Sequence, residues 1–168
     1  QGEFSARVQA TRAALTQLAA WHAQDLRIEL AVNLSAPDIA DPELLEFILQ
    51  SLREVRVPAG SLTLEITESA FMADPQRAIR NMELLYVAGV RFSIDDFGTG
   101  YSSLSQLQQL TVDELKIDRS FVSELATRDD SMAIVRAVTG LGKSLGIVTT
   151  AEGVETDAQF DLLRREGC

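Results

Sequence analysis

Short stretches of alternating apolar and polar residues recur along the chain and predict β-strands. In four stretches the apolar side chains share one parity, and a polar residue of the opposite parity lies at or near the end. The fifth, over residues 147–152, is a weaker case because both of its faces are mixed, but it also ends on a polar residue. These polar residues are Asn33, Glu65, Asp95, Lys116 and Glu152. Because alternate residues of a strand point to opposite faces, we expect the five side chains to lie on one common side of a sheet.

Helix signals lie between the predicted strands. Asp41-Pro42 and Asp74-Pro75 each place a capping side chain before a proline at the first helical position. After the second signal, Ile79, Met82 and Tyr86 follow at helical spacing and are expected to face the core. Strands that alternate with helices imply a parallel sheet with helices outside and a ligand site at the carboxyl ends of the strands.

The polar face distinguishes two parallel α/β architectures. A sheet covered by helices on both sides is apolar on both faces, whereas polar and small residues on one parity suit the inside of a barrel. We therefore predict an α/β fold of the (β/α)8 TIM-barrel type, as a single domain over residues 1–168. A whole barrel of this type takes roughly 250 residues, so we expect an incomplete barrel of about five βα units.

Composition narrows the function. The net charge of −10 argues against a DNA or RNA partner, because such binding depends on lysine and arginine. A single histidine, His22, excludes histidine-rich zinc sites and serine triads within the chain, and a single Cys168 excludes an internal disulfide. The lone cysteine favours a reducing, cytoplasmic location. No apolar run is long enough to span a bilayer, which is compatible with a membrane-anchored parent protein.

The segment from Asp95 to Gly100 carries the most specific chemistry. Two adjacent carboxylates, Asp95 and Asp96, end an apolar strand and precede a glycine-containing loop. Carboxylate and amide oxygens are the ligands that Mg²⁺ and Mn²⁺ prefer, and neighbouring carboxylates can bridge two ions roughly 3.5–4 Å apart. An acidic pocket with such ions can accept a phosphodiester, and Lys116 adds a positive charge on the other side.

Five motifs together resemble the EAL-domain family. They are Asn33-Leu34-Ser35, Glu65-Ile66-Thr67-Glu68, the run from Asp95-Asp96-Phe97 to Leu104, Lys116-Ile117-Asp118-Arg119-Ser120-Phe121, and Ala151-Glu152-Gly153-Val154-Glu155-Thr156. Members of this bacterial family hydrolyse the second messenger cyclic di-GMP to linear pGpG on a (β/α)8-like barrel with two Mg²⁺ or Mn²⁺ ions. The resemblance also implies a homodimer and sensory or GGDEF domains in the parent protein.

The resemblance implies a role for each matching residue. Asn33, Glu65 and Asp95 would hold the first metal ion, and Asp95 with Asp96 the second. Lys116 would orient the attacking water with help from Asp118, Glu152 would be the general base, and Glu155 a supporting carboxylate. Glu68 would anchor a loop that helps form the second metal site and the dimer contact. The loop residues are Phe97, Gly98, Thr99, Gly100, Tyr101, Ser102 and Ser103.

Simpler roles exist for two of these residues. Glu68 is also compatible with capping a helix that starts near Ser69, and Lys116 with an internal ion pair. An enolase-like enzyme would also use carboxylate ligands and a lysine base on a barrel, but the full motif set argues against it. The main alternative is a non-catalytic EAL-like module that binds cyclic di-GMP or a protein partner.

Two family segments lie outside the matched region. The Glu-Ala-Leu segment should precede the first strand found here, and a Gln-Gly-Tyr segment should follow Cys168. The first supplies a metal-binding glutamate and the second a metal-site glutamine. We therefore expect these 168 residues alone to be inactive and to self-associate through open strand edges.

Overall fold

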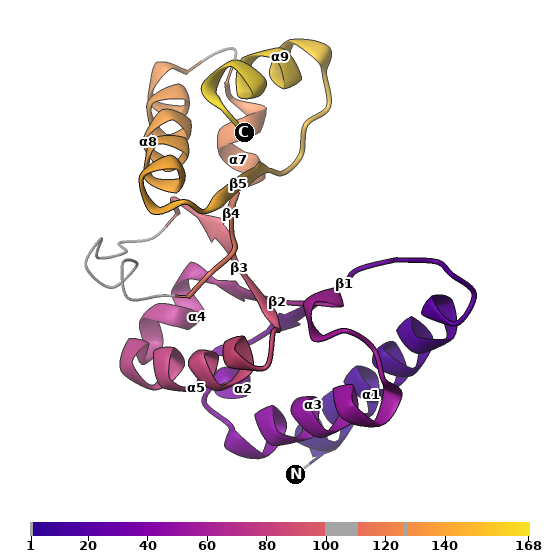
Figure 1. Ribbon diagram of the computed structural model, residues 1–168. Coiled ribbons are helices and arrows are strands. Elements are labelled where there is room, and N and C mark those ends of the chain that lie inside the picture. The colour runs from indigo at the N-terminus through magenta and orange to yellow at the C-terminus, as the bar shows by residue number, and fades with distance from the viewer. Residues whose placement is uncertain (1, 100–110, 126–127) are drawn as a thin grey trace.

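The computed structural model of the protein describes residues 2–99, 111–125 and 128–168, with side chains described from residue 9 onward. Helices and strands alternate along the chain (Figure 1). The elements are α1 (Gly2–His22), β1 (Leu30–Leu34), α2 (Ala36–Ile39), α3 (Pro42–Val55), the 3₁₀ turn η1 (Ala59–Ser61), β2 (Leu62–Thr67), α4 (Glu68–Ala73), α5 (Pro75–Val87), β3 (Arg91–Phe97), β4 (Glu114–Ile117), α7 (Arg119–Ser123), α8 (Asp129–Leu145), β5 (Val148–Ala151) and α9 (Asp157–Glu166).

The five strands form one parallel sheet in the order β1-β2-β3-β4-β5. In Figure 1 the strands follow one another in chain order, with α1 and α3 beside the first strands and α8 and α9 beside the last. A doubly wound sheet reverses its strand order at a switch point, whereas this order continues in one direction, as in a barrel. The predicted α/β fold of the barrel type is confirmed.

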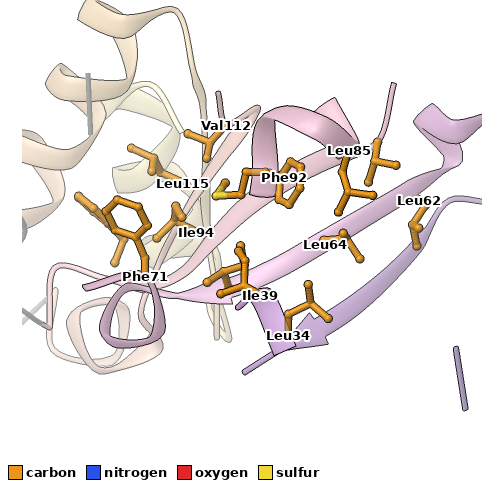
Figure 2. Packing of buried hydrophobic residues seen from close by; sticks show 14 of the residues in the cluster. Leu34, Ile39, Leu62, Leu64, Phe71, Leu85, Phe92, Ile94, Val112 and Leu115 are labelled. Carbon is orange, nitrogen blue, oxygen red and sulfur yellow. The ribbon is translucent and has the colours of Figure 1, made fainter. Parts of the chain in front are cut away.

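The core lies between the sheet and the helices. Leu62, Leu64 and Ile66 alternate along β2 and are completely buried, and the matching positions of β3 and β4 are equally apolar (Figure 2). Burying one such side chain contributes about 1.5–3 kcal/mol. The opposite parity of the same strands carries the polar residues, so one face of the sheet builds the fold and the other is free for chemistry.

Two helix starts agree with the sequence prediction, and one residue of a predicted helix face does not. Asp41 and Asp74 cap α3 and α5, accepting hydrogen bonds from backbone N–H groups at 2.9 and 3.1 Å. The buried face of α5 comprises Ala78, Met82 and Leu85, while Tyr86 is 43% exposed. Met82 is completely buried and Ile79 packs against the core, so of the three predicted residues only Tyr86 departs from the expectation. Its hydroxyl is better placed near water.

An extra residue in β3 displaces the carboxylates from regular alternation. Ile94 pairs with Leu115 and Phe97 with Ile117, so three steps in β3 match two in β4. This arrangement is a β-bulge, which bends a strand and redirects its side chains. Asp96 belongs to the bulge and has φ 55°, and the strand continues beyond it to Phe97. Because of the bulge, Asp96 stays within the strand. Two successive carboxylates, those of Asp95 and Asp96, therefore lie at the carboxyl end of the sheet.

Candidate active site at the carboxyl ends of the strands

The strand register places the predicted polar residues on one face. Asn33 pairs with Glu65, and Asp95 pairs with Thr67, two residues after Glu65 on the same parity. Lys116 pairs with Thr150, two residues before Glu152. Glu152 follows β5 directly, and its N–H donates to the Ile117 carbonyl at 3.1 Å. The five side chains therefore belong to the inner face, toward the carboxyl ends of five neighbouring strands.

Lys116 lies among the carboxylates of three other strand ends. Its Nζ is 2.6 Å from Glu152 Oε1, 2.9 Å from Glu65 Oε1 and 3.9 Å from Asp95 Oδ1. Only 15% of its side chain is exposed. Burial lowers the pKa of the ammonium, but hydrogen bonds to Glu152 and Glu65 and the charge of Asp95 outweigh burial, and the pKa lies above its usual value. Lys116 therefore stays charged at neutral pH and holds the acidic side chains together.

The pKa values of Asp96 and Asp118 shift in opposite directions, although the two carboxylates are close neighbours. Burial and the negative charges of Asp95 and Asp118 raise the pKa of Asp96. Asp118 caps α7, accepting hydrogen bonds from the Ser120 hydroxyl and, at 2.9 Å, from its N–H. The hydroxyl hydrogen bond is the largest of the effects that lower the pKa of Asp118. Asp118 is therefore the better stabilised anion, while Asp96 lacks compensating charge.

This excess of negative charge fits divalent cations. Glu65, Asp95, Asp96, Asp118 and Glu152 contribute carboxylates near the same strand ends, and Lys116 neutralises only part of them. Hard oxygen ligands of this kind suit Mg²⁺ and Mn²⁺. Within residues 2–99, 111–125 and 128–168, no three Asp, Glu, His or Cys side chains converge in a ready-made metal site. Glu65 is bound instead to the Lys116 ammonium.

Asn33 and Glu155 are exposed, whereas the residues of the acidic group and Lys116 are partly buried. Asn33 lines an open hollow of about 720 Å³ at the ends of β1 and β2, together with Ser35 and Thr67. Glu155 lies in the exposed turn before α9, where its N–H donates to Gln159 Oε1 at 2.8 Å. A second hollow of about 750 Å³ lies at the amino ends of the strands, around Arg91, away from the acidic group. The hollow beside Asn33 lies at the same end of the sheet as the predicted chemistry.

Glu68 connects β2 to the loop after β3. Its side chain is 2% exposed, and Oε2 accepts a hydrogen bond from the Gly98 N–H at 3.0 Å. Thr67 is the residue that caps α4, accepting from the Ala70 N–H at 3.2 Å, so a capping role for Glu68 is wrong. The loop residues Gly100, Tyr101, Ser102 and Ser103 lie outside the described residues. Sequence reasoning missed the Thr67 cap, although threonine is a preferred N-cap residue and lies just before the predicted helix start near Ser69.

The EAL domain family model matches residues 6–168 of this chain. The chain belongs to the EAL domain family. Among its relatives, the bifunctional diguanylate cyclase/cyclic di-GMP phosphodiesterase MucR of Pseudomonas aeruginosa is 47% identical over 139 residues, covering 83% of this chain. The oxygen sensor protein DosP of Escherichia coli is 40% identical over 156 residues, covering 92% of it. The chain spans about a fifth of the length of these relatives.

Solved EAL structures resemble this one closely. The cyclic di-GMP complex of the PaMucR phosphodiesterase superposes with a TM-score of 0.93 at 41% identity, covering 98% of this chain and 67% of that one. The manganese and cyclic di-GMP complex of Klebsiella pneumoniae BlrP1 gives a TM-score of 0.84 at 28% identity, covering 95% and 40%. None of the helices in the described part of this EAL chain has the length and hydrophobicity of a membrane span.

Removing the Glu68 carboxylate is expected to release the loop after β3 of this EAL domain. A hydrogen bond to a charged group contributes about 1.5–3 kcal/mol, so Glu68→Ala should speed amide hydrogen exchange at Gly98 by about 10- to 100-fold. In the complete domain the rate of turnover should fall strongly, while the thermal unfolding temperature should fall only slightly. Glu68→Gln retains an acceptor oxygen and serves as the matched control. Unchanged exchange across residues 97–99 in Glu68→Ala would refute the anchoring role.

Neutralising Asp96 is expected to stabilise this EAL domain. Asp96→Asn removes a charge that burial and Asp95 disfavour, and asparagine tolerates the positive φ at this position. We expect the free energy of unfolding in urea to rise by about 0.5–1 kcal/mol in metal-free buffer at pH 7. Asp96→Ala removes the same charge, but alanine tolerates the positive φ less well than asparagine. The free energy of unfolding should therefore rise less in this variant. A less stable Asp96→Asn variant would contradict the charge argument.

Proposed function

We propose that the domain to which this chain belongs hydrolyses cyclic di-GMP to linear pGpG with the help of Mg²⁺ or Mn²⁺. The observation that carries this proposal is the group formed by Lys116 with Glu65, Asp95 and Glu152 at the carboxyl ends of the strands. It is supported by family membership and by relatives named as cyclic di-GMP phosphodiesterases. The manganese and cyclic di-GMP complex of BlrP1 supports a divalent cation.

Each carboxylate has a proposed role in this reaction. Asn33, Glu65 and Asp95 would hold one ion, and Asp95 and Asp96 the other. Bound divalent cations neutralise phosphodiester oxygens and make a water more acidic. Because Lys116 contacts Glu65, a bound ion and the ammonium would share the charge of the same carboxylate.

The other residues act on the water and on the phosphodiester. Lys116 would orient the water, and Asp118 would support Lys116 and the carboxylates. Glu152 is 38% exposed, which leaves it accessible to water, and it would accept a proton as the water oxygen attacks phosphorus. One phosphorus–oxygen bond of the ring breaks, the hydroxyl stays on phosphorus, and the released ribose oxygen gains a proton. Glu155 would support Glu152 from the next turn.

The experiment uses an extended chain, which adds the Glu-Ala-Leu and Gln-Gly-Tyr segments expected from the family. We expect this chain to convert cyclic di-GMP to pGpG with Mn²⁺ or Mg²⁺ and to stop when EDTA is added, measured by chromatography of the nucleotides. Asp95→Asn should abolish turnover, because Asp95 is assigned to both ions. Full activity in EDTA would overturn the metal-dependent mechanism. Binding of cyclic di-GMP without hydrolysis would support the non-catalytic module instead.

A homodimer inside a larger cytoplasmic signalling protein, with sensory or GGDEF domains, is also proposed from the family resemblance. The relatives MucR and DosP are themselves long proteins, of which this chain matches about a fifth. Analytical ultracentrifugation of the extended chain tests the dimer directly. A single monomeric species at micromolar concentration would contradict it.

A further inference from the structure

Gly153, which follows Glu152, is packed against the start of helix α7. Its φ is +71°, a conformation that side-chain-bearing residues rarely adopt. A Cβ atom at this position would lie 2.7 Å from the Arg119 Cβ and 3.5 Å from the Arg119 Cα. These atoms belong to or adjoin the backbone of Arg119, so a rotation of its side chain cannot relieve the contact. Any side chain at position 153 would therefore separate this turn from α7.

Helix α7 is the more firmly packed partner in this contact. Val122 in α7 is completely buried, and its carbonyl accepts a hydrogen bond from Gln159 Nε2 at 3.2 Å. Asp118 caps the first turn of α7 by accepting from Ser120. Phe121 lies against Gly98, where an added Cβ would be 3.2 Å from its ring. The turn that contains Gly153 is exposed by comparison, so this turn would give way.

Displacing the turn would move Glu152. Glu152 is held by its N–H on the Ile117 carbonyl at 3.1 Å and by its carboxylate on Lys116 at 2.6 Å. We propose that Gly153 is a positioning residue, whose missing side chain lets the turn after β5 pack on Arg119 and so keeps the Glu152 carboxylate on the Lys116 ammonium. The effect on catalysis rests on the proposed function, whereas the effect on the Glu152–Lys116 ion pair does not.

Two double variants test the contact between a Cβ at position 153 and the Arg119 Cβ. Gly153→Ala introduces the Cβ, and it is combined either with Arg119→Gly or with Arg119→Ala. Both second substitutions remove the guanidinium, but only Arg119→Gly also removes the Cβ that the new methyl would meet. In crystal structures of the extended chain, we expect the Glu152–Lys116 ion pair to be broken in Gly153→Ala and in the double variant with Arg119→Ala. It should be restored in the double variant with Arg119→Gly.

Kinetics of the extended chain supply the second measurement. Displacing a catalytic group by about 1 Å can reduce a rate by about 10²-fold, so Gly153→Ala should lower kcat by about that factor with little change in KM or Mn²⁺ affinity. Arg119→Gly should recover most of kcat in the double variant, and Arg119→Ala should not. A purely structural role would lower the amount of folded protein and leave kcat per folded molecule unchanged.

The outcomes separate the two proposals. An intact Glu152–Lys116 ion pair in Gly153→Ala, or equal behaviour of the two double variants, would overturn the positioning role. An extended chain that never hydrolyses cyclic di-GMP would overturn the proposed function, while the crystal structures would still decide the role of Gly153. If Gly153→Ala does not fold, Gly153→Asn takes its place in the series, since asparagine tolerates positive φ better and still carries the Cβ.

Discussion

Glu152→Gln in the extended chain is expected to lower kcat for cyclic di-GMP hydrolysis by about 10²- to 10⁴-fold, the usual contribution of a general base. Glutamine has nearly the shape of glutamate, and its amide oxygen can still accept a hydrogen bond from Lys116, 2.6 Å away in the structure. It cannot take a proton from water. Binding should therefore change little, because a base acts mainly on the transition state.

Two measurements and one control test this assignment. Single-turnover hydrolysis in Mn²⁺ gives the rate of the chemical step, and calorimetry in Ca²⁺ gives the affinity for cyclic di-GMP. Glu155→Gln is the matched control, since Glu155 is three residues away in an exposed turn and carries the same charge. We expect it to reduce kcat by less than about tenfold. A Glu152→Gln variant that loses affinity as severely as turnover would show that Glu152 serves binding and not proton transfer.

The side on which the polar residues lie was predictable from the sequence because strand alternation is a local property. Asn33, Glu65 and Lys116 each have an apolar neighbour on either side, and Asp95 directly follows Ile94, so the parity of each residue follows from its own strand. The register then brings these parities together, with Asn33 opposite Glu65. Five strands that agree in this way already indicate a barrel-type polar face.

Features that depend on a neighbouring element were not predictable in the same way. The bulge at Asp96 arises from the pairing of β3 with β4, and no residue within β3 shows that an extra position is needed. The choice of Leu85 over Tyr86 depends on how α5 sits on the sheet. The partners of Lys116 come from three other segments of the chain, so the sequence predicts a charged group but not its pairing.

Replacing Lys116 by methionine is expected to destabilise the domain by about 2 kcal/mol in metal-free buffer at pH 7. Removing one member of a fully buried ion pair costs about 3–5 kcal/mol, and the partial exposure of these carboxylates, 12% for Glu65 and 38% for Glu152, reduces that figure. Lys116→Arg keeps the charge and should retain most of the stability. Both variants should lose turnover: methionine carries no positive charge, and the arginine guanidinium does not reproduce the geometry of an ammonium. Urea unfolding and nucleotide chromatography measure the two effects separately.

Adding Mn²⁺ makes this prediction a test of where the cations bind. A ligand that binds only the folded state stabilises it by an amount that grows with the logarithm of the ligand concentration divided by its Kd. If Glu65 and Asp95 hold cations, Lys116→Met should gain more stability from Mn²⁺ than the unmodified chain, because the ion replaces the ammonium that neutralised the same oxygens. An equal gain in both proteins would mean that Mn²⁺ and Lys116 do not share these carboxylates, and the assignment of Glu65 as a metal ligand would then be wrong.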